Sequence, residues 1–178
     1  MVPADVADVT PWRDWCSAAE GALRFLDGHL SWDFWMVTQV VDGRQIVLVA
    51  EPPEAVRPGV ELPWEESFCR QMIEGNAPRL ATVTAAVPAY ASRTSGPLRD
   101  VAAYVGVPLL RADGSLFGTV CGVAFRARPR SAARDLRVVE AVARMLSTLM
   151  AAGLTPPPPP DRVSAIRAAP GAPAPGAV

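Results

Sequence analysis

The sequence predicts an α+β domain with a mainly antiparallel sheet of five or six strands and helices on both faces. Two pairs of β-rich runs, residues 31–52 and 103–125, each contain an Asp-Gly step that is typical of a hairpin turn. Helical patterns flank these pairs, and there is no regular alternation of strand and helix that would indicate a parallel sheet. A chain of 178 residues has room for one such domain.

The first element is a predicted helix that begins near Thr10 and ends at Gly28. Thr10 is expected to be the N-cap, and Pro11 suits the first helical position. Residues 31–41 then form a strand that is apolar on both sides, which indicates a central position in the sheet. One face carries Trp32, Phe34, Met36 and Val40, and the other carries Trp35, Val37 and Val41.

The middle of the chain predicts a second helix, a short strand and a long connection. The helix is expected to start at Pro63 and to end at Gly75, and residues 77–83 follow it as an extended piece. Residues 84–100 are longer than most loops of a compact domain, and loops of such length are often functional.

The last predicted helix is capped by Ser131 and runs to about residue 152. It carries two adjacent apolar stripes, which is more than one sheet face requires and indicates a partner helix. We therefore expect the first and last helices to lie together on one face, and the middle helix and residues 84–100 to cover the other. The stripes are Leu136, Val139, Ala143, Leu146 and Met150, and Val138, Val142, Met145 and Leu149.

Composition excludes several classes of partner. The formal net charge is −1 with one histidine, so the chain lacks the basic surface expected of a nucleic-acid-binding protein. No apolar run approaches the roughly 18 residues of a membrane span, and the N-terminus has no signal-peptide pattern. Three scattered cysteines do not form a disulfide framework. We predict a cytoplasmic protein without nucleic-acid or membrane partners.

The ends of the chain differ in composition from its centre. Residues 1–9 are expected to be flexible, and residues 153–178 to be a disordered tail rich in proline, alanine and glycine. Residues 10–152 are therefore the predicted domain.

The hairpin at 103–125 has glycine where strands usually carry bulky residues, at Gly106, Gly118 and Gly122. Glycine inside a strand often marks a place where another group approaches the backbone closely. The missing side chains could make room for a ligand, a helix or a loop. Alternatively, they could admit the bulk of Trp32, Phe34 and Trp35 from the neighbouring strand.

Three segments resemble a GAF domain: "YVGVPLLRADGSLFGTVCGVAF", "SFCRQMIEGNAPRLATV" and "PAY" at residues 88–90. The resemblance covers nearly all of residues 11–152 and is to the bacterial subclass often found in front of diguanylate cyclases and other signalling modules. It implies a GAF/PAS-like sheet with a small-molecule cavity on one side and a helical dimerisation surface on the other.

The residues do not match the known chemistry of several GAF subclasses. The Asn-Lys…Phe…Asp-Glu signature of cyclic-nucleotide binding is missing, and Cys69 and Cys121 are not followed by the histidine common in bilin sites. His29 lies away from the expected cavity, which argues against haem. We therefore predict no cofactor and no metal.

Free methionine-(R)-sulfoxide reductases are the enzymatic branch of this fold, and they need an attacking and a resolving cysteine. Cys69 suits one position, but residues 70–120 contain no other cysteine, and Cys121 is expected to be a buried small hydrophobe.

We predict a non-catalytic regulatory module that binds a small molecule and signals to a partner through a homodimer of its first and last helices. The alternative is a ligand-free dimerisation or docking scaffold. The candidate ligand-binding residues are Trp64, Phe68, Cys69, Met72, Tyr90, Ser92, Arg93, Thr94, Asp100 and Tyr104.

Overall fold

The structure, a computed structural model, describes residues 9–93 and 96–160. The flexible segment predicted at residues 1–9 lies outside the described residues except for Val9, and so do residues 161–178 of the predicted tail. The predicted domain boundaries stay a prediction.

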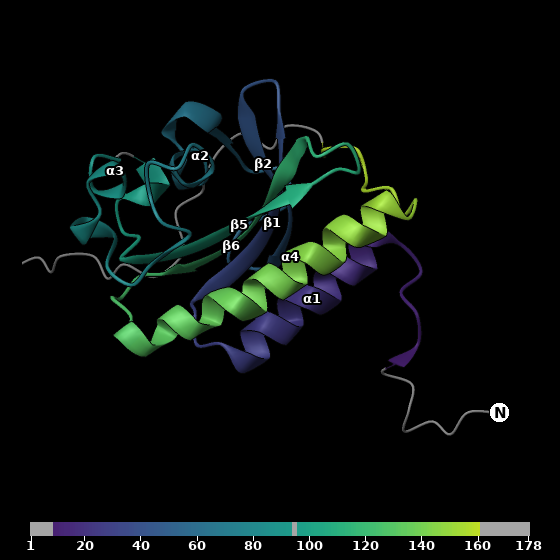
Figure 1. The fold of residues 1–178 in the computed structure, drawn as a ribbon, viewed down its shortest axis with the longest axis horizontal. Helices are drawn as coiled ribbons and strands as arrows, with labels where there is room; N and C mark the ends of the chain where they lie inside the picture. Colours follow the sequence, from purple (N-terminus) through teal and green to yellow (C-terminus); the bar gives the residue numbers. More distant parts are fainter. Residues whose placement is uncertain (1–8, 94–95, 161–178) are drawn as a thin grey trace, which may run out of the picture.

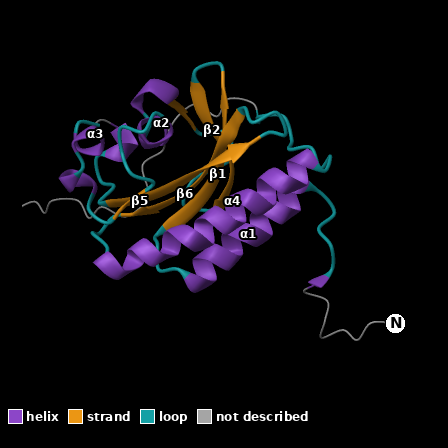
Figure 2. Cartoon of the chain, in the orientation of Figure 1, coloured by secondary structure: helices purple, strands orange, loops and turns teal. Residues whose placement is uncertain are grey.

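The centre of the molecule is a six-stranded sheet in the order β3-β2-β1-β6-β5-β4 (Figures 1 and 2). Every neighbouring pair of strands is antiparallel. The strands are β1 (Phe34–Val41), β2 (Arg44–Glu51), β3 (Glu61–Pro63), β4 (Leu80–Ala81), β5 (Ala103–Leu110) and β6 (Leu116–Ala124). The α+β class, the antiparallel sheet and the central position of β1 are confirmed.

Helices cover both faces of this sheet (Figure 1). The long helices α1 (Trp15–His29) and α4 (Asp135–Ala151) lie side by side on one face. The short helices α2 (Phe68–Ile73) and α3 (Pro88–Ala91) lie over the other face. The indole N–H of Trp15 donates to the carbonyl of Leu146 across 3.2 Å, which ties the two long helices together. The predicted pairing of the first and last helices is confirmed.

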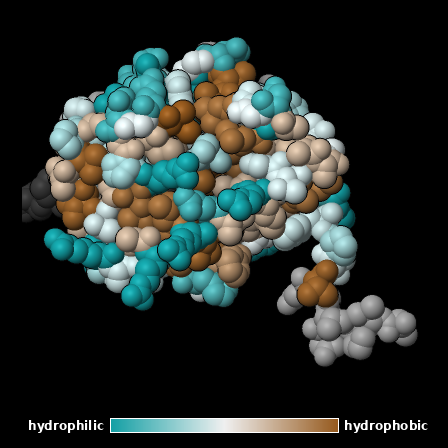
Figure 3. Space-filling model, viewed as in Figure 1, coloured by the Kyte–Doolittle hydropathy of each residue, from teal (hydrophilic) through white to brown (hydrophobic). Residues whose placement is uncertain are grey.

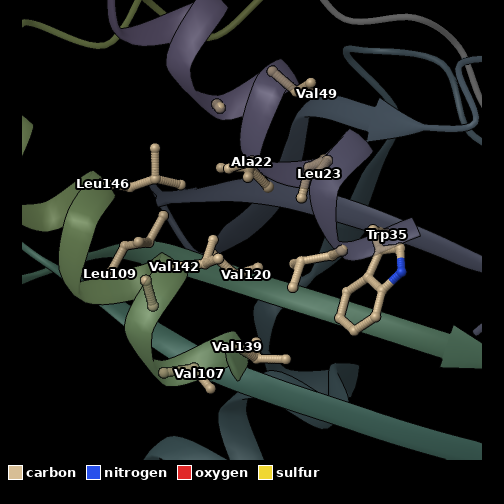
Figure 4. Close-up of a cluster of buried hydrophobic side chains, with 14 of the residues drawn as sticks. Ala22, Leu23, Trp35, Val49, Val107, Leu109, Val120, Val139, Val142 and Leu146 are labelled. Atoms are coloured by element: carbon tan, nitrogen blue, oxygen red, sulfur yellow. The ribbon is translucent and has the colours of Figure 1, made fainter. Parts of the chain in front are cut away.

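The larger core lies between the sheet and the α1–α4 pair (Figure 4). Burial of each large apolar side chain of this kind contributes about 1.5–3 kcal/mol. The buried residues labelled in Figure 4 are Ala22, Leu23, Trp35, Val49, Val107, Leu109, Val120, Val139, Val142 and Leu146. Trp32 also packs here, with its indole N–H on Asp135 at 2.9 Å. The prediction that Trp32 shares a face with Phe34 is therefore wrong, because Trp32 precedes the strand and its side chain does not follow strand alternation.

The second apolar stripe of α4 is largely used within the chain. Val142 is buried, while Val138, Met145 and Leu149 are partly buried against the same core. Helix α1 thus provides part of the partner surface that the second stripe of α4 indicates.

The N-terminus of α1 differs from the prediction. Asp14, not Thr10, is the N-cap: its carboxylate accepts a hydrogen bond from the Ser17 N–H at 2.7 Å, and the Ser17 hydroxyl bonds the Asp14 backbone. This reciprocal capping box gives hydrogen-bond partners to the backbone N–H groups of Asp14 and Ser17, which would otherwise lack them. The helix therefore starts at Trp15. Trp12 lies before the helix and is 44% exposed.

Two other helix starts also differ. Ser67 caps α2 by accepting from the Arg70 N–H at 3.0 Å, so the helix is shorter than the predicted Pro63–Gly75, and Trp64–Glu66 forms a separate 3-10 turn. Residues 130–134 are likewise a 3-10 turn, and Ser131 does not cap α4. In both cases the first turn is tighter than an α-helix, which is common at helix ends.

The long connection at 84–100 is more regular than predicted. It contains α3 and two 3-10 turns, Thr84–Ala86 and Gly96–Leu98.

None of the helices in the described part of the chain combines the length and apolar character needed to cross a membrane.

The three hairpin glycines do not share one face. Gly122 pairs with Trp35 on the side of α1 and α4, and a Cβ at this position would come within 2.5 Å of the indole ring. Gly106 lies on the opposite side, below the Tyr104 ring, which a Cβ would overlap. Side chains of the chain itself therefore occupy the space at both glycines, as the second of our two interpretations expected for Trp35.

Candidate functional site

The aromatic candidate residues, including Tyr104, which was expected to make a polar contact, pack together between the sheet and the α2–α3 layer. Phe68 of α2, Tyr90 of α3 and Tyr104 of β5 are each at most 4% exposed. Their rings are mutual neighbours, with centroid distances of 4.8, 5.5 and 5.3 Å. Met72 is also buried, and Trp64 packs at the edge of the same cluster. Aromatic rings thus fill the place where the resemblance implies a ligand cavity.

Two of the other polar candidates, Ser92 and Arg93, bond to the backbone of α3. The exposed Ser92 hydroxyl donates to the Ala89 carbonyl at 3.2 Å, and the Arg93 guanidinium donates to the same carbonyl at 2.9 Å. Asp100 is exposed, and Thr94 lies outside the described residues. A ligand-binding role for these four residues stays a prediction.

A second set of side chains, which we call the polar cluster, lies between α2 and the sheet. It consists of Thr38, Gln45, Cys69, Tyr104, Thr119 and Cys121, all of which are buried. The Cys69 sulfur is at its centre. It lies 2.9 Å from Gln45 Nε2, 3.0 Å from Tyr104 Oη, 3.3 Å from Thr119 Oγ1 and 3.1 Å from Cys121 Sγ.

Two hydrogen bonds of the polar cluster are directed toward the Cys69 sulfur, one from the Gln45 amide and one from the Tyr104 hydroxyl. The two N–H groups of the Gln45 amide can donate to the Cys69 sulfur and to the Thr38 hydroxyl, which is 3.0 Å away. Thr38 lies 2.7 Å from the Thr119 hydroxyl, which in turn reaches Cys121 at 3.0 Å. Because a thiolate only accepts hydrogen bonds, this arrangement favours the charged form of Cys69.

The two thiols are consequently unequal. Burial by itself raises the pKa of Cys69, but hydrogen bonds from Cys121, Thr119, Tyr104 and Gln45 outweigh it and lower this pKa to about 7. Burial raises the pKa of Cys121, and so does the adjacent Cys69. Cys69 is therefore the more acidic and more nucleophilic sulfur of the pair.

Cys16 on α1 is a third free thiol, so the measurement uses a Cys16→Ser protein. We expect its thiolate absorbance to rise with pH around a midpoint of about 7, below the ordinary thiol value. Tyr104→Phe removes a donor to Cys69 and should move this midpoint upward. Tyr90→Phe is the matched control, since the Tyr90 hydroxyl donates to the Pro78 carbonyl at 2.6 Å and not to Cys69. Equal shifts in both variants would contradict the assignment.

Sequence reasoning missed most of the polar cluster. Thr38, Gln45 and Thr119 were not candidates, and Cys121 was expected to be an inert buried thiol. A signal was present, because Thr119 and Cys121 are two residues apart on one strand and so share a face. What places Cys69 against them is the docking of α2, which no local pattern specifies.

A hollow that is not part of the polar cluster lies on the surface. It has a volume of about 550 Å³ and is lined by Asp33, Ala124, Phe125, Arg126 and Arg128 at the ends of β1 and β6. It is open to solvent and holds none of the candidate residues.

The sequence matches no protein-family model, and no curated protein is significantly similar to it. Solved structures do match. One is the GAF domain of a phosphoenolpyruvate-protein phosphotransferase from Acinetobacter, with a TM-score of 0.64 and 11% identity over 82% of this chain and 86% of that one. This chain has the GAF fold.

Other GAF-like structures are also similar. The chromophore-binding domain of Stigmatella aurantiaca bacteriophytochrome matches with a TM-score of 0.57 and 18% identity over 79% of this chain. This chain spans about half of that structure, 55% of its length. The free methionine-R-sulfoxide reductase of Neisseria meningitidis, solved with its substrate, matches with a TM-score of 0.59 and 15% identity over 77% of this chain and 78% of that one.

These identities are low enough that the GAF fold is what the comparisons establish. Sensory domains and an enzyme share it, so the fold alone does not separate a regulatory role from a catalytic one. That choice depends on the residues beneath α2.

Proposed function

We propose that this chain is a non-catalytic regulatory GAF module that binds a small molecule between the sheet and the α2–α3 layer. The polar cluster is the observation that carries the proposal. Burying polar groups costs free energy unless they are hydrogen-bonded, and apolar residues of the same shape serve a purely structural core about as well. A group of hydrogen-bonding side chains at this position is what a polar ligand would use.

Binding at this site requires a rearrangement. The rings of Phe68, Tyr90 and Tyr104 occupy the space, so the described conformation is the closed state of the proposed site. Helices α2 and α3 have six and four residues, and such short elements open at lower free energy than the core strands. A ligand that binds the open state would shift the population toward it.

We further propose a homodimer formed through α1 and α4, which passes the change to a signalling partner in the cytoplasm. Figure 3 shows hydrophobic residues interspersed with hydrophilic ones over the face seen in Figure 1. Phe25 of α1 is 47% exposed, and Trp12 before it is 44% exposed, so both are available to a second copy. The bacterial signalling subclass that the sequence resembles supports this role.

Ligand binding is tested by native mass spectrometry of the freshly purified chain and by thermal unfolding against a library of polar metabolites. We expect at least one compound to raise the melting temperature of the native protein and to have no effect on Gln45→Leu, which lacks the amide of the polar cluster. Compounds that stabilise both proteins equally would place the binding site elsewhere.

The proposed dimer is tested by light scattering of the same samples, which reports the oligomeric state, and a monomer would rule out the dimer.

The second candidate function is a ligand-free scaffold, which the close packing of the three rings favours. It predicts that no compound changes the melting temperature while the dimer persists. A catalytic role is tested separately: reductant-dependent turnover of free methionine sulfoxide that disappears in Cys69→Ser would overturn the non-catalytic assignment.

A further inference from the structure

We propose that Cys69 and Cys121 form a redox-active dithiol, which a hydroperoxide converts into a disulfide that ties α2 to β6. This inference goes beyond the proposed function, and it requires neither ligand binding nor dimerisation. It rests on the geometry of the two sulfurs and on the groups around them.

The two sulfurs are already in contact. Their separation is 3.1 Å, and both cysteines are free thiols. A disulfide bond is about 2.05 Å long, so closure needs a movement of only about 1 Å. Cys16 is on α1, on the opposite side of the sheet, and is not part of the polar cluster.

The surroundings distinguish the attacking sulfur from the resolving one. Gln45 and Tyr104 donate hydrogen bonds to Cys69 at 2.9 and 3.0 Å. At Cys121 the Tyr104 hydroxyl is 3.8 Å away, and the Gln45 amide makes no bond to this sulfur. The Thr119 hydroxyl contacts both sulfurs, at 3.3 Å from Cys69 and 3.0 Å from Cys121, so the Gln45 and Tyr104 donors make the difference. Cys69 is therefore the sulfur whose thiolate is stabilised, and Cys121 keeps its proton next to it.

The reaction takes place in two steps. The Cys69 thiolate attacks the distal oxygen of the hydroperoxide, the O–O bond breaks, and Cys69 sulfenic acid and an alkoxide or hydroxide form. This anion takes up a proton from solvent, equivalent to the one that the Cys69 thiol released on ionisation. The Cys121 sulfur then attacks the Cys69 sulfur, hydroxide leaves, and the thiol proton completes a water molecule. Two thiols are oxidised by two electrons in total, and the hydroperoxide is reduced to an alcohol or, for hydrogen peroxide, to water.

The oxidant must reach buried atoms. Cys69 is 3% exposed and Cys121 is not exposed, so α2 has to open locally before reaction. This helix has six residues and is held by its Ser67 cap and by ion pairs of Arg70 with Glu65 and Glu74. Oxidation should therefore be slower than at a surface thiolate and selective for small hydroperoxides.

The test uses the full chain with Cys16→Ser, treated with hydrogen peroxide. Intact mass should fall by two hydrogen atoms, both thiols should disappear from a denaturing titration, and dithiothreitol should restore them. A digest should contain the peptide of Cys69 joined to that of Cys121. Two unreacted thiols, or a covalent dimer in place of this peptide, would overturn the proposal.

Variants separate the two roles. Cys121→Ser should stop at a Cys69 sulfenic acid, one oxygen heavier and trapped by dimedone, whereas Cys69→Ser should stay unmodified on the same timescale. Oxidation of Cys69→Ser at the native rate would contradict the assigned order. If either variant fails to fold, the cross-linked peptide from the Cys16→Ser protein still decides.

The substitutions Tyr104→Phe and Tyr90→Phe test whether the Tyr104 hydroxyl activates Cys69. Tyr104→Phe should slow thiol loss near neutral pH, because each unit by which the pKa of Cys69 rises lowers the thiolate fraction by up to about tenfold. Tyr90→Phe leaves the Cys69 donors in place and should react at the native rate. Equal rates of thiol loss in the Tyr104→Phe variant and in the protein with native Tyr104 would show that the Tyr104 hydroxyl does not activate Cys69.

Discussion

Gly118→Ala is expected to lower the free energy of unfolding by at least about 3 kcal/mol, which for a chain of this size corresponds to a fall of roughly 10 °C in melting temperature. The reason is a backbone contact. A Cβ at Gly118 would overlap the Thr38 carbonyl group of the neighbouring strand β1. Unlike a flexible side chain, a backbone carbonyl in the centre of a sheet cannot move without disturbing the β1–β6 ladder.

Gly28→Ala is the matched control. Gly28 lies near the end of α1, and a Cβ there would meet nothing within 4 Å. Alanine in a helix is favoured over glycine by up to about 1 kcal/mol, so this variant should be neutral or more stable. Urea unfolding of both variants is the measurement. A Gly118→Ala protein as stable as the control would mean that the two strands are further apart than the structure places them.

Trp35→Ala is expected to cost about 3–5 kcal/mol, because it removes a large side chain that is completely buried in the main core. The same ring is what makes glycine necessary at position 122, where a Cβ would lie 2.5–2.8 Å from three of its carbon atoms. Gly122→Ala alone should therefore destabilise the native protein by about 1–3 kcal/mol.

The two substitutions should not be additive. In the Trp35→Ala background the ring is gone, and Gly122→Ala should be neutral or slightly stabilising, since it then fills space and restricts the unfolded chain. The coupling free energy from a double-mutant cycle measures this contact directly. Additive effects would show that Gly122 is needed for a reason other than the indole ring.

The contacts at Gly118 and Gly122 also explain why the hairpin at 103–125 has glycine where strands usually carry bulky residues. Gly122 admits Trp35, Gly106 admits the Tyr104 ring, and Gly118 admits the backbone of β1. The glycines therefore serve close packing in the described conformation. A ligand would have to displace rings such as Tyr104, which is why the proposed site is tested through a change of conformation as well as through binding.

The proposed disulfide between Cys69 and Cys121 would also change the stability of the protein. It would link residues 52 positions apart, and the entropy of closing a loop of this size is worth up to about 4 kcal/mol in the unfolded state. Loss of the hydrogen bonds now made to the Cys69 sulfur would offset part of this gain. Oxidation would thus link α2 covalently to strand β6.

The hairpins were predictable from the sequence because turn chemistry is local. Asp42 and Gly43 both have positive φ angles, 50° and 71°, which is the conformation that an Asp-Gly turn favours. The periodicity of the apolar residues likewise predicted α1, α4 and their common face. Helix starts were less predictable, because Asp14 and Ser67 competed successfully with Thr10 and Pro63 through hydrogen bonds to particular N–H groups.

By itself, the sequence determined two Asp-Gly hairpins and two long amphipathic helices, since turn chemistry and helical periodicity involve residues close along the chain. The order of these elements then indicated the α+β class, and the second apolar stripe of the last helix indicated a partner helix. Only the tertiary structure decided which side chains meet beneath α2. Sheet register pairs Thr38 with Thr119 and Met36 with Cys121, and the docking of α2 then brings Cys69 onto them. Contacts between residues so distant in sequence depend on the whole packed fold, and no local pattern encodes them.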